Sequence, residues 1–255
     1  MDDLSTSGKA LTSSLDQLRI VNRFLGGYSA TLSALAPWLA RQAGRRVRLL
    51  DVGTGVGDFP EMIVRWAARH PATAKSRRFW ATLDHPAAAL DLSITAVDAN
   101  PATVAYARER LSRRLPPDLA AKVCVEHADA LALPYPDQSF DIAIAAMFLH
   151  HFPAGEAVDV LREMSRVATC GIVVNDLQRH PAAYYGIAAL TRALPASPMV
   201  RHDGPLSVLR GFTRTELAGI AERAGIAHFT VRWHWAFRWV LSSVESNKPC
   251  ATMPS

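Results

Sequence analysis

Strongly apolar segments alternate with segments of helical spacing through most of the 255-residue chain. We expect strands at 47–52, 92–98, 121–129, 140–148 and 170–177, and helices at 60–70, 100–115 and 155–168. Continuous apolar strands that alternate with helices form parallel sheets, because such strands are buried on both faces. The pattern therefore predicts an α/β fold, with a doubly wound, Rossmann-like, mostly parallel sheet and helices on both faces.

The C-terminal part adds a helix and two further strands. A helix is expected over 213–226, because Thr213 and Glu216 match a capping box and Gly225 suits the C-terminal end. The next residues, 227–241, alternate like two antiparallel strands joined near 234–237. Together with the earlier strands they predict a seven-stranded sheet with an antiparallel strand at its C-terminal end.

Three segments stand outside this alternation. Residues 1–43 contain amphipathic helical patterns and are expected to form a helical segment that covers the site, with packing on the sheet edge as the alternative. Residues 44–255 would then form one domain, in which 71–91 are an insertion between the first two strands. Residues 178–212 carry four prolines, which predict short helices and loops that cap the substrate site.

The first strand ends in Asp51, and glycines follow at positions 53, 55 and 57 in the sequence LLDVGTGVG. Ligands of open parallel sheets bind beyond the carboxyl ends of the strands, so a ligand is expected to approach this backbone closely. The spacing differs from the dinucleotide fingerprint, and the lysine of the phosphate-binding loop is absent. The Asp51 carboxylate would repel a pyrophosphate, but it suits a ligand that carries an ammonium or sulfonium group.

With the motifs that follow it, this loop resembles the class I S-adenosylmethionine-dependent methyltransferases. LLDVGTGVGDFP (49–60) is similar to their first motif, ITAVDAN (94–100) to the second, and HADALALPYPDQSFDIAIAAMFLHHF (127–152) to the third and fourth. The last of these is similar to the small-molecule, ubiquinone-methyltransferase-like members. The resemblance implies S-adenosyl-L-methionine as cofactor and S-adenosyl-L-homocysteine as product.

The resemblance also implies which residues bind the cofactor. Asp98 would accept hydrogen bonds from both ribose hydroxyls, and Asp129 would accept one from the adenine amino group. Strand-end capping is the alternative for both, and Asp91 is a rival to Asp98. The other cofactor-binding positions so implied are Asp51 near the ammonium group; Gly53, Thr54, Gly55 and Gly57 along the amino acid portion; Ala99, Asn100 and Ala130 beside the adenosine; and Ala146 and Met147 beside the methionine portion.

His150 and His151 directly follow the fourth predicted strand. In plant-type phenol O-methyltransferases a histidine at a comparable place deprotonates the acceptor hydroxyl, and imidazole suits a general base near neutral pH. We expect a catalytic role for one of the two, with packing or orientation as the alternative. The N/D-P-P-Y/F motif of nucleobase and glutamine N-methyltransferases is absent from this position, and nothing resembles the paired-glutamate loop of protein-arginine methyltransferases.

A second polar cluster follows the fifth predicted strand, in NDLQRHPAAYY. We expect its members Asp176, Arg179, His180 and Tyr184 to contact the acceptor, the alternative being a structural Asp–Arg pair that holds the cap. This pattern is similar to small bacterial methyltransferases of secondary metabolism. It favours O-methylation of a phenolic or polyketide-like hydroxyl, with C-methylation of a quinone-type ring and cofactor binding without catalysis as alternatives.

Composition limits the partners. The 28 basic residues give a net charge of +5, but they are dispersed, which is typical of solvated surfaces rather than of a nucleic-acid footprint. The three cysteines lack metal-type spacing, so we expect no metal site, and free buried thiols at Cys124 and Cys170. Without a signal-peptide pattern or an apolar run of roughly 20 residues, a cytoplasmic protein with a small aromatic or lipophilic acceptor is expected, and a homodimer is left open.

Overall fold

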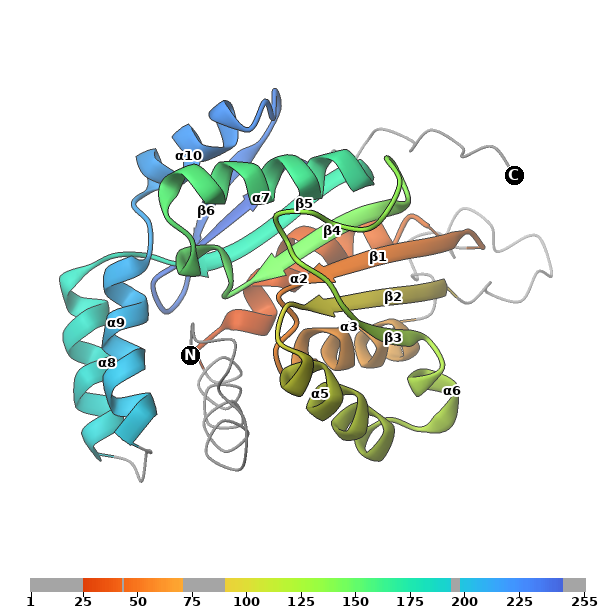
Figure 1. Cartoon of the computed structure of the whole chain (residues 1–255), viewed down its shortest axis with the longest axis horizontal. Coiled ribbons are helices and arrows are strands. Elements are labelled where there is room, and N and C mark those ends of the chain that lie inside the picture. Colours follow the sequence, from red (N-terminus) through yellow and green to blue (C-terminus); the bar gives the residue numbers. More distant parts are fainter. Residues whose placement is uncertain (1–24, 43, 71–89, 194–197, 245–255) are drawn as a thin grey trace, which may run out of the picture.

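The computed structural model describes residues 25–42, 44–70, 90–193 and 198–244. Seven strands form one sheet in the order β3-β2-β1-β4-β5-β7-β6 (Figure 1). Their bounds are β1 Arg46–Val52, β2 Asp91–Asp98, β3 Val123–His127, β4 Phe140–Ala146, β5 Ala168–Leu177, β6 Thr230–His234 and β7 Arg238–Ser242. Five strands pair in parallel, and β7 pairs antiparallel with both β5 and β6. The predicted fold is confirmed, including the antiparallel C-terminal strand.

Helices cover both faces of this sheet. The helical segments are α2 Gly27–Leu39, α3 Asp58–Arg69, α5 Pro101–Arg114, α6 Pro117–Ala120, the 3-10 turn η1 Leu149–His151, α7 Ala154–Val167, α8 Pro181–Ala193, α9 Pro198–Arg210 and α10 Arg214–Arg223. The expected capping box is present at the start of α10, where Thr213 and Glu216 satisfy each other's backbone N–H groups.

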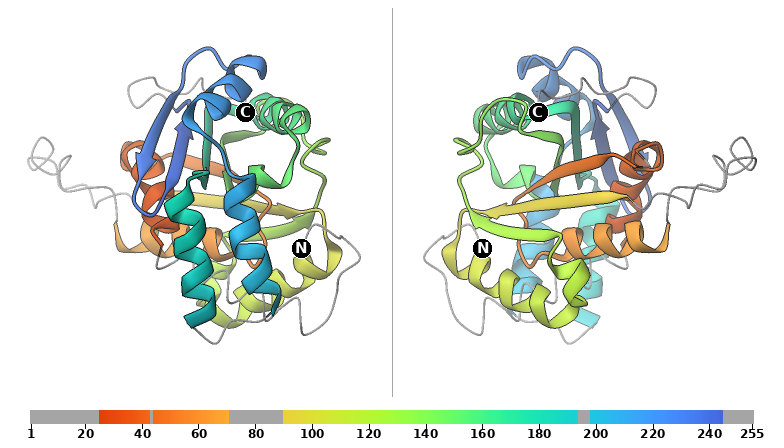
Figure 2. Two further views of the ribbon diagram at one scale, coloured as in Figure 1. Left: turned by 90° about the vertical axis from the view of Figure 1, so that its left-hand side faces the viewer. Right: turned by 90° about the vertical axis from the view of Figure 1, so that its right-hand side faces the viewer.

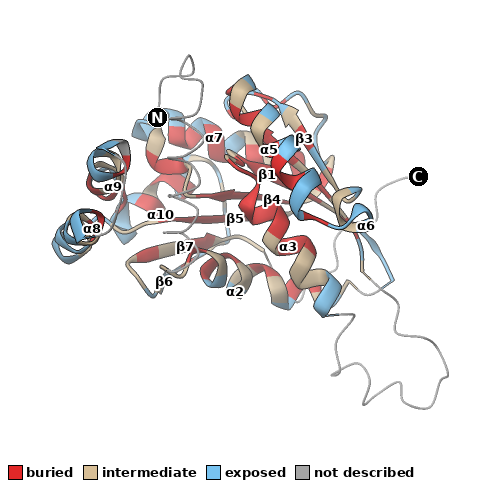
Figure 3. Cartoon of the chain, turned by 90° about the horizontal axis from the view of Figure 1, so that it is seen from below, coloured by how far each residue is buried: buried red, intermediate tan, exposed pale blue. Residues whose placement is uncertain are grey.

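Two apolar cores result from the pleat of the strands, because neighbouring residues point to opposite faces. Leu49 and Ile142 lie in the core under α2, α3 and α5, whereas Leu50 and Ala143 lie in the core under α7 and α10. Figure 3 shows the buried residues concentrated along the strands between these layers. A sheet buried on both faces leaves its strand ends as the places where polar side chains can gather.

The segment after β5 forms two long helices rather than the expected short ones. Helices α8 and α9 lie side by side next to the carboxyl ends of the parallel strands (Figures 1 and 2). Pro181 and Pro198 occupy first helical positions, where the missing N–H costs nothing, and Pro205 lies inside α9. Proline content alone therefore gave the wrong element lengths.

Several other expectations either fall outside the described residues or differ from the structure. Residues 1–24 and 71–89, which hold most of the predicted N-terminal segment and insertion, lie outside them. Cys124 is an exposed free thiol on the edge strand β3, and Cys170 is disulfide-bonded, so the expectation of two free buried thiols is wrong. Among the described helices none is both long and apolar enough to cross a membrane.

A buried ion pair fixes the loop that follows β1. Arg110 of α5 donates through Nη2 to Oε2 of Glu61 at 2.5 Å and through Nη1 to the carbonyl oxygen of Val56 at 2.9 Å. Arg114 donates through Nε to Oε1 of Glu61 at 3.1 Å. Burial alone would raise the pKa of the Glu61 carboxyl, but the two guanidinium groups lower it below its usual value. Helices α3 and α5 are thereby tied to the glycine loop.

We expect Arg110→Met to lower the free energy of unfolding by about 3 kcal/mol or more, because it leaves the buried Glu61 carboxylate without its main partner. Denaturant titration measures the effect. Arg113→Met is the matched control, because Arg113 pairs with Glu109 in solvent and such pairs contribute at most about 1 kcal/mol. Equal losses for the two variants would contradict a structural role for the buried pair.

Candidate functional site

A cavity of about 960 Å³ lies at the carboxyl ends of β1, β2 and β4 and extends to α8 and α9. Ten of the twelve predicted cofactor positions line it, and two, Asp51 and Gly57, do not. The ten are Gly53, Thr54, Gly55, Asp98, Ala99, Asn100, Asp129, Ala130, Ala146 and Met147. Both predicted histidines line it as well. The topology thus brings loops that are distant in sequence to one space.

Two glycines of the loop after β1 are required for different reasons. A Cβ on Gly53 would lie 2.0 Å from the ring of Phe148, so the loop packs against the protein's own aromatic side chain. A Cβ on Gly55 would meet no atom within 4 Å, but this residue has a φ of +55°, which favours glycine. At Gly53 the ring of Phe148 therefore leaves no room for a side chain, whether or not a ligand is bound.

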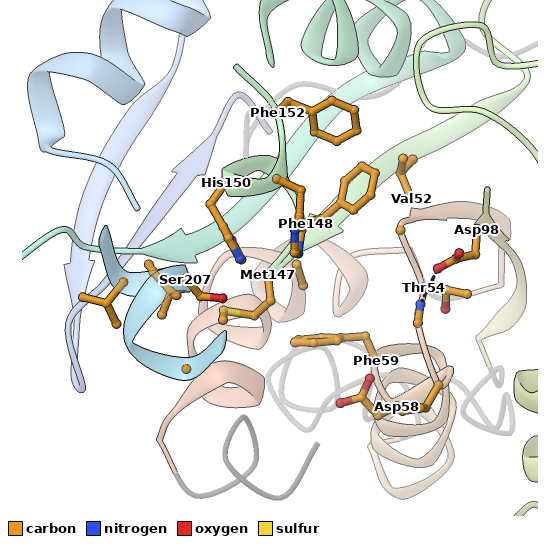
Figure 4. A pocket seen from close by; sticks show the side chains of 18 of the residues that line it. Val52, Thr54, Asp58, Phe59, Asp98, Met147, Phe148, His150, Phe152 and Ser207 are labelled. Atoms are coloured by element: carbon orange, nitrogen blue, oxygen red, sulfur yellow. Dashed lines mark hydrogen bonds between the residues drawn. The ribbon is translucent and has the colours of Figure 1, made fainter. Parts of the chain in front are cut away.

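Asp98 ends β2 and faces this loop (Figure 4). Its Oδ2 accepts the N–H of Gly55 at 3.0 Å, and its Oδ1 accepts the N–H of Asn100 at 2.9 Å. Burial raises the pKa of the Asp98 carboxyl above its usual value, although these N–H groups partly oppose the shift. Asp91, the alternative acidic residue, is exposed at the opposite end of β2. Of the two, Asp98 is therefore the one that lines the cavity.

Asn100 and Asp129 use their side chains locally while they line the cavity. Oδ1 of Asn100 accepts the N–H groups of Ala102 and Thr103 and caps α5 as expected. Oδ1 of Asp129 accepts the N–H of Leu131 at 2.9 Å, and the side chain is exposed. A local capping hydrogen bond and a place at the cavity therefore occur together in both residues.

Three carboxyl groups surround the glycine loop. Asp51 is only 2 % exposed, and its Oδ2 has no hydrogen-bond partner within the described residues. Burial raises the pKa of the Asp51 carboxyl to about 7, and the negative charges of Asp58 and Asp98 add to this shift. A pyrophosphate would increase the repulsion, whereas a cationic group would relieve it. The charge of this region fits the amino acid portion of S-adenosylmethionine, which carries an ammonium group.

His150 is held by a buried carboxylate. Its Nδ1 lies 2.7 Å from Oδ1 of Asp176, and its backbone N–H donates to Oδ2 at 3.1 Å. Both side chains are almost fully buried, at 4 % and 0 % exposed. Burial would raise the pKa of the Asp176 carboxyl, but the charge and hydrogen bond of His150 lower it below its usual value. With a carboxylate as its partner, Nδ1 is the donor of this hydrogen bond, and in a neutral imidazole Nε2 is then the nitrogen that carries the lone pair.

The imidazole of His150 points into the cavity between Met147 and Ser207 (Figure 4). The ring of His151 lies beside it, with 4.3 Å between the ring centres and a 34° tilt. Both histidines reach the cavity, and His150 is the one whose ring the buried Asp176 orients. The geometry thus distinguishes two neighbours that the sequence left equivalent.

The cavity lining includes none of the four residues predicted to contact the acceptor. Asp176 turns toward His150, and Arg179 pairs with Glu216 near the surface instead of with Asp176. The Nδ1 atom of His180 accepts the N–H of Ala182, while Tyr184 packs edge-on against Tyr185. The four side chains therefore make contacts within the chain outside the cavity lining.

Other lining residues were missed. Phe59, Phe148 and Phe152 contribute aromatic surface near the strand ends, and Arg238 of β7 is a buried cation at the same cavity. Burial lowers the pKa of the Arg238 guanidinium to about 10, and its Nε donates to the carbonyl oxygen of Leu25. An arginine inside an apolar strand was the available signal for this last residue.

Comparison with known proteins agrees with this geometry. The methyltransferase-domain family model matches residues 81–171. The chain is 33% identical over 137 residues to 27-O-demethylrifamycin SV methyltransferase of Amycolatopsis mediterranei, a match that covers 54% of this chain and 39% of that protein. It is 27% identical over 197 residues to demethylmenaquinone methyltransferase of Roseiflexus castenholzii, covering 72% and 70% of the two chains.

Solved structures share the fold at low identity. A SAM-dependent methyltransferase from Aquifex aeolicus superposes with a TM-score of 0.57 at 17% identity, covering 90% of this chain and 96% of that one. Human N-acetylserotonin methyltransferase, solved with SAM, gives a TM-score of 0.56 at 15% identity, covering 89% and 53%. The sequence matches, the sheet order and the acidic glycine-loop site agree with one another, and together they support a class I S-adenosylmethionine-dependent methyltransferase.

Proposed function

We propose that this chain transfers the methyl group of S-adenosylmethionine to a hydroxyl oxygen of a small lipophilic acceptor, of the phenolic or polyketide type. The observation that carries the proposal is the His150–Asp176 pair, which presents a proton-accepting nitrogen to the cavity. One relative is named as a methyltransferase of an O-demethylated rifamycin, which supports an O-linked acceptor. That relative is more than twice as long as its matched part, so the shared region supports the chemistry rather than the same acceptor.

The site residues fit the cofactor on charge. Asp98 would take the ribose hydroxyls with the lone pairs that its two backbone N–H donors leave open, and Asp51 would face the ammonium group. Asn100, Asp129 and Ala130 line the part of the cavity where the adenine would lie. When bound, the cofactor supplies an electrophilic methyl group on a sulfonium. The chain's remaining task is to prepare the acceptor oxygen.

His150 would perform that task as the general base. Nε2 would accept the proton of the acceptor hydroxyl, and Asp176 would stabilise the imidazolium that forms. The same carboxylate holds the ring through Nδ1, so Nε2 keeps its direction. The cap formed by α8 and α9 bounds the cavity on the proposed acceptor side. We also propose that the N-terminal segment covers this site, because Leu25 lines the cavity just before α2.

We expect His150→Ala to lower kcat by on the order of 10²- to 10⁴-fold, the usual contribution of a general base. Asp176→Asn should lower kcat as well, because the ring then loses its negative partner. Both are checked by mass spectrometry of the methylated product from a panel of phenolic and quinone-type acceptors. His151→Ala is the matched control, and a larger loss in that variant than in His150→Ala would contradict the assignment.

A second reaction, C-methylation of a quinone-type ring, is favoured by the similarity to a demethylmenaquinone methyltransferase over most of both chains. NMR spectra of the product separate the two, since a methyl carbon bonded to oxygen and one bonded to a ring carbon have different shifts. An O-methyl product supports the first proposal, and a C-methyl product replaces it with the second.

Cofactor selection can be tested without an acceptor. Calorimetry should show binding of S-adenosylhomocysteine and none of NAD, and Asp98→Ala should weaken S-adenosylhomocysteine binding by about 2 kcal/mol or more, for the loss of two charge-assisted hydrogen bonds. Asp91→Ala is the control at the other end of the same strand. Tight NAD binding, or an equal loss in the Asp91 variant, would refute the assigned cofactor contacts.

Stability without ligand should depend on pH through Asp51. Because its pKa is about 7 when folded and 3.8 as the reference value, the folded state holds more protons between these values. The free energy of unfolding should therefore fall as pH rises from about 4 to about 7, by up to about 4 kcal/mol for this group. Above this window the loss is complete.

Asp51→Asn removes this contribution, so its stability relative to the unaltered chain should rise between pH 5 and pH 8 in denaturant titrations. S-adenosylhomocysteine should also bind the unaltered chain more tightly as pH rises through 7, because the ionised carboxylate attracts its ammonium group. Parallel pH profiles for the two chains, in stability and in binding, would show that Asp51 does not titrate in this window.

A further inference from the structure

The acceptor side of the cavity is formed by one face of α8 and one face of α9. The lining residues from these helices are Ala182, Ala183, Gly186, Ile187, Leu190, Thr191, Val200, Gly204, Ser207 and Val208. Their spacing of three or four residues places each set on one side of its helix. None of these side chains is charged, and most are small or aliphatic. We call this part of the cavity the cap compartment.

The cap compartment adjoins the proposed base. Helix α9 packs on the η1 turn that carries His150, and Ser207 of α9 points toward the His150 side of the cavity (Figure 4). The hydroxyl of Thr191 is occupied by the carbonyl oxygen of Ile187 at 2.9 Å. An acceptor whose hydroxyl reaches His150 would therefore place its remaining body against an almost wholly apolar wall, where a charged body would lose its hydration without compensation.

The two glycines of the cap compartment differ in their surroundings. A Cβ on Gly204 would lie 3.3 Å from Cγ1 of Ile187 and 3.6 Å from Cγ2 of Thr191, so Gly204 allows α8 and α9 to approach closely. A Cβ on Gly186 would meet no atom within 4 Å. Packing therefore requires a small residue at Gly204 and places no such demand on Gly186.

The backbone gives no reason for Gly186 either. It lies in the interior of α8, without the positive φ that favours glycine elsewhere in the chain. Glycine is a poorer helix former than alanine, so this position weakens the helix. What its missing side chain does provide is open space on the cavity-lining face, between Ala182 and Leu190.

We propose that Gly186 determines the width of acceptor that the cap compartment admits, and that this acceptor is neutral and as wide as a fused-ring aromatic. The inference rests on the proposed function for the direction in which the acceptor lies. A side chain at position 186 would occupy the compartment without disturbing the contact between α8 and α9.

Binding of a fluorescent, neutral fused-ring probe, N-phenyl-1-naphthylamine, tests this without cofactor or turnover. We expect the unaltered chain to bind it, Gly186→Ala to bind it more weakly, and Gly186→Leu to lose at least tenfold in affinity. Phenol, as a single-ring competitor that displaces the probe, should be affected much less. Gly219→Ala and Gly219→Leu are matched controls, because Gly219 lies inside α10 with no atom within 4 Å of a Cβ and outside the cavity lining.

Thermal unfolding accompanies each measurement. Both Gly→Ala changes should raise Tm, since both replace glycine within a helix, so weaker probe binding by Gly186→Ala cannot be ascribed to unfolding. Failure of the unaltered chain to bind the probe, or equal affinities for the Gly186→Leu and Gly219→Leu variants, would overturn the proposal. Failure of methyl transfer in the acceptor panel, with these probe results intact, would instead count against the proposed function alone.

Discussion

Burial of the parallel sheet on both faces is the constraint on which the rest of the molecule depends. The central parts of β1, β2, β4 and β5 are largely buried, and the acidic side chains of these strands lie near the strand ends. All four strands run in the same direction, and their carboxyl ends therefore meet at one edge. Asp51, Asp98 and Asp176 all lie at or near that edge, which concentrates negative charge beside the cavity.

These three carboxylates differ in their hydrogen-bond partners. Asp98 accepts two backbone N–H groups, and Asp176 accepts the ring and backbone N–H of His150 together with the N–H of Leu177. Asp51 retains an oxygen without a partner among the described residues, and its pKa is raised. Two of the charges are thus satisfied within the chain, while the third has one oxygen without a hydrogen-bond partner among the described residues.

The sequence was sufficient wherever local pattern decides structure. The strand runs, the glycine loop, the N-cap at Asn100 and the capping box at Thr213 depend on neighbours within a few residues, and all were predicted correctly. The sequence did not predict side-chain contacts between residues of different helices and strands. The pairing of His150 with Asp176 joins residues of two different elements, so the sequence could not choose between the two histidines or recognise that Asp176 is a support for one of them.

The cap shows a second limit of prediction from sequence, because proline disrupts the interior of a helix but is favourable at its first position. Pro181 and Pro198 begin helices instead of ending them, and once α8 and α9 are continuous their cavity-lining faces follow from helical periodicity. The cavity then has two unlike regions, an acidic one at the glycine loop and an uncharged one under the cap. His150 lies between them, where apolar surroundings strengthen the hydrogen bond to Asp176 and the direction of its free nitrogen is fixed. In the proposed reaction, orientation of the base and selection of the acceptor would therefore meet at a single side chain, although they arise from separate parts of the fold.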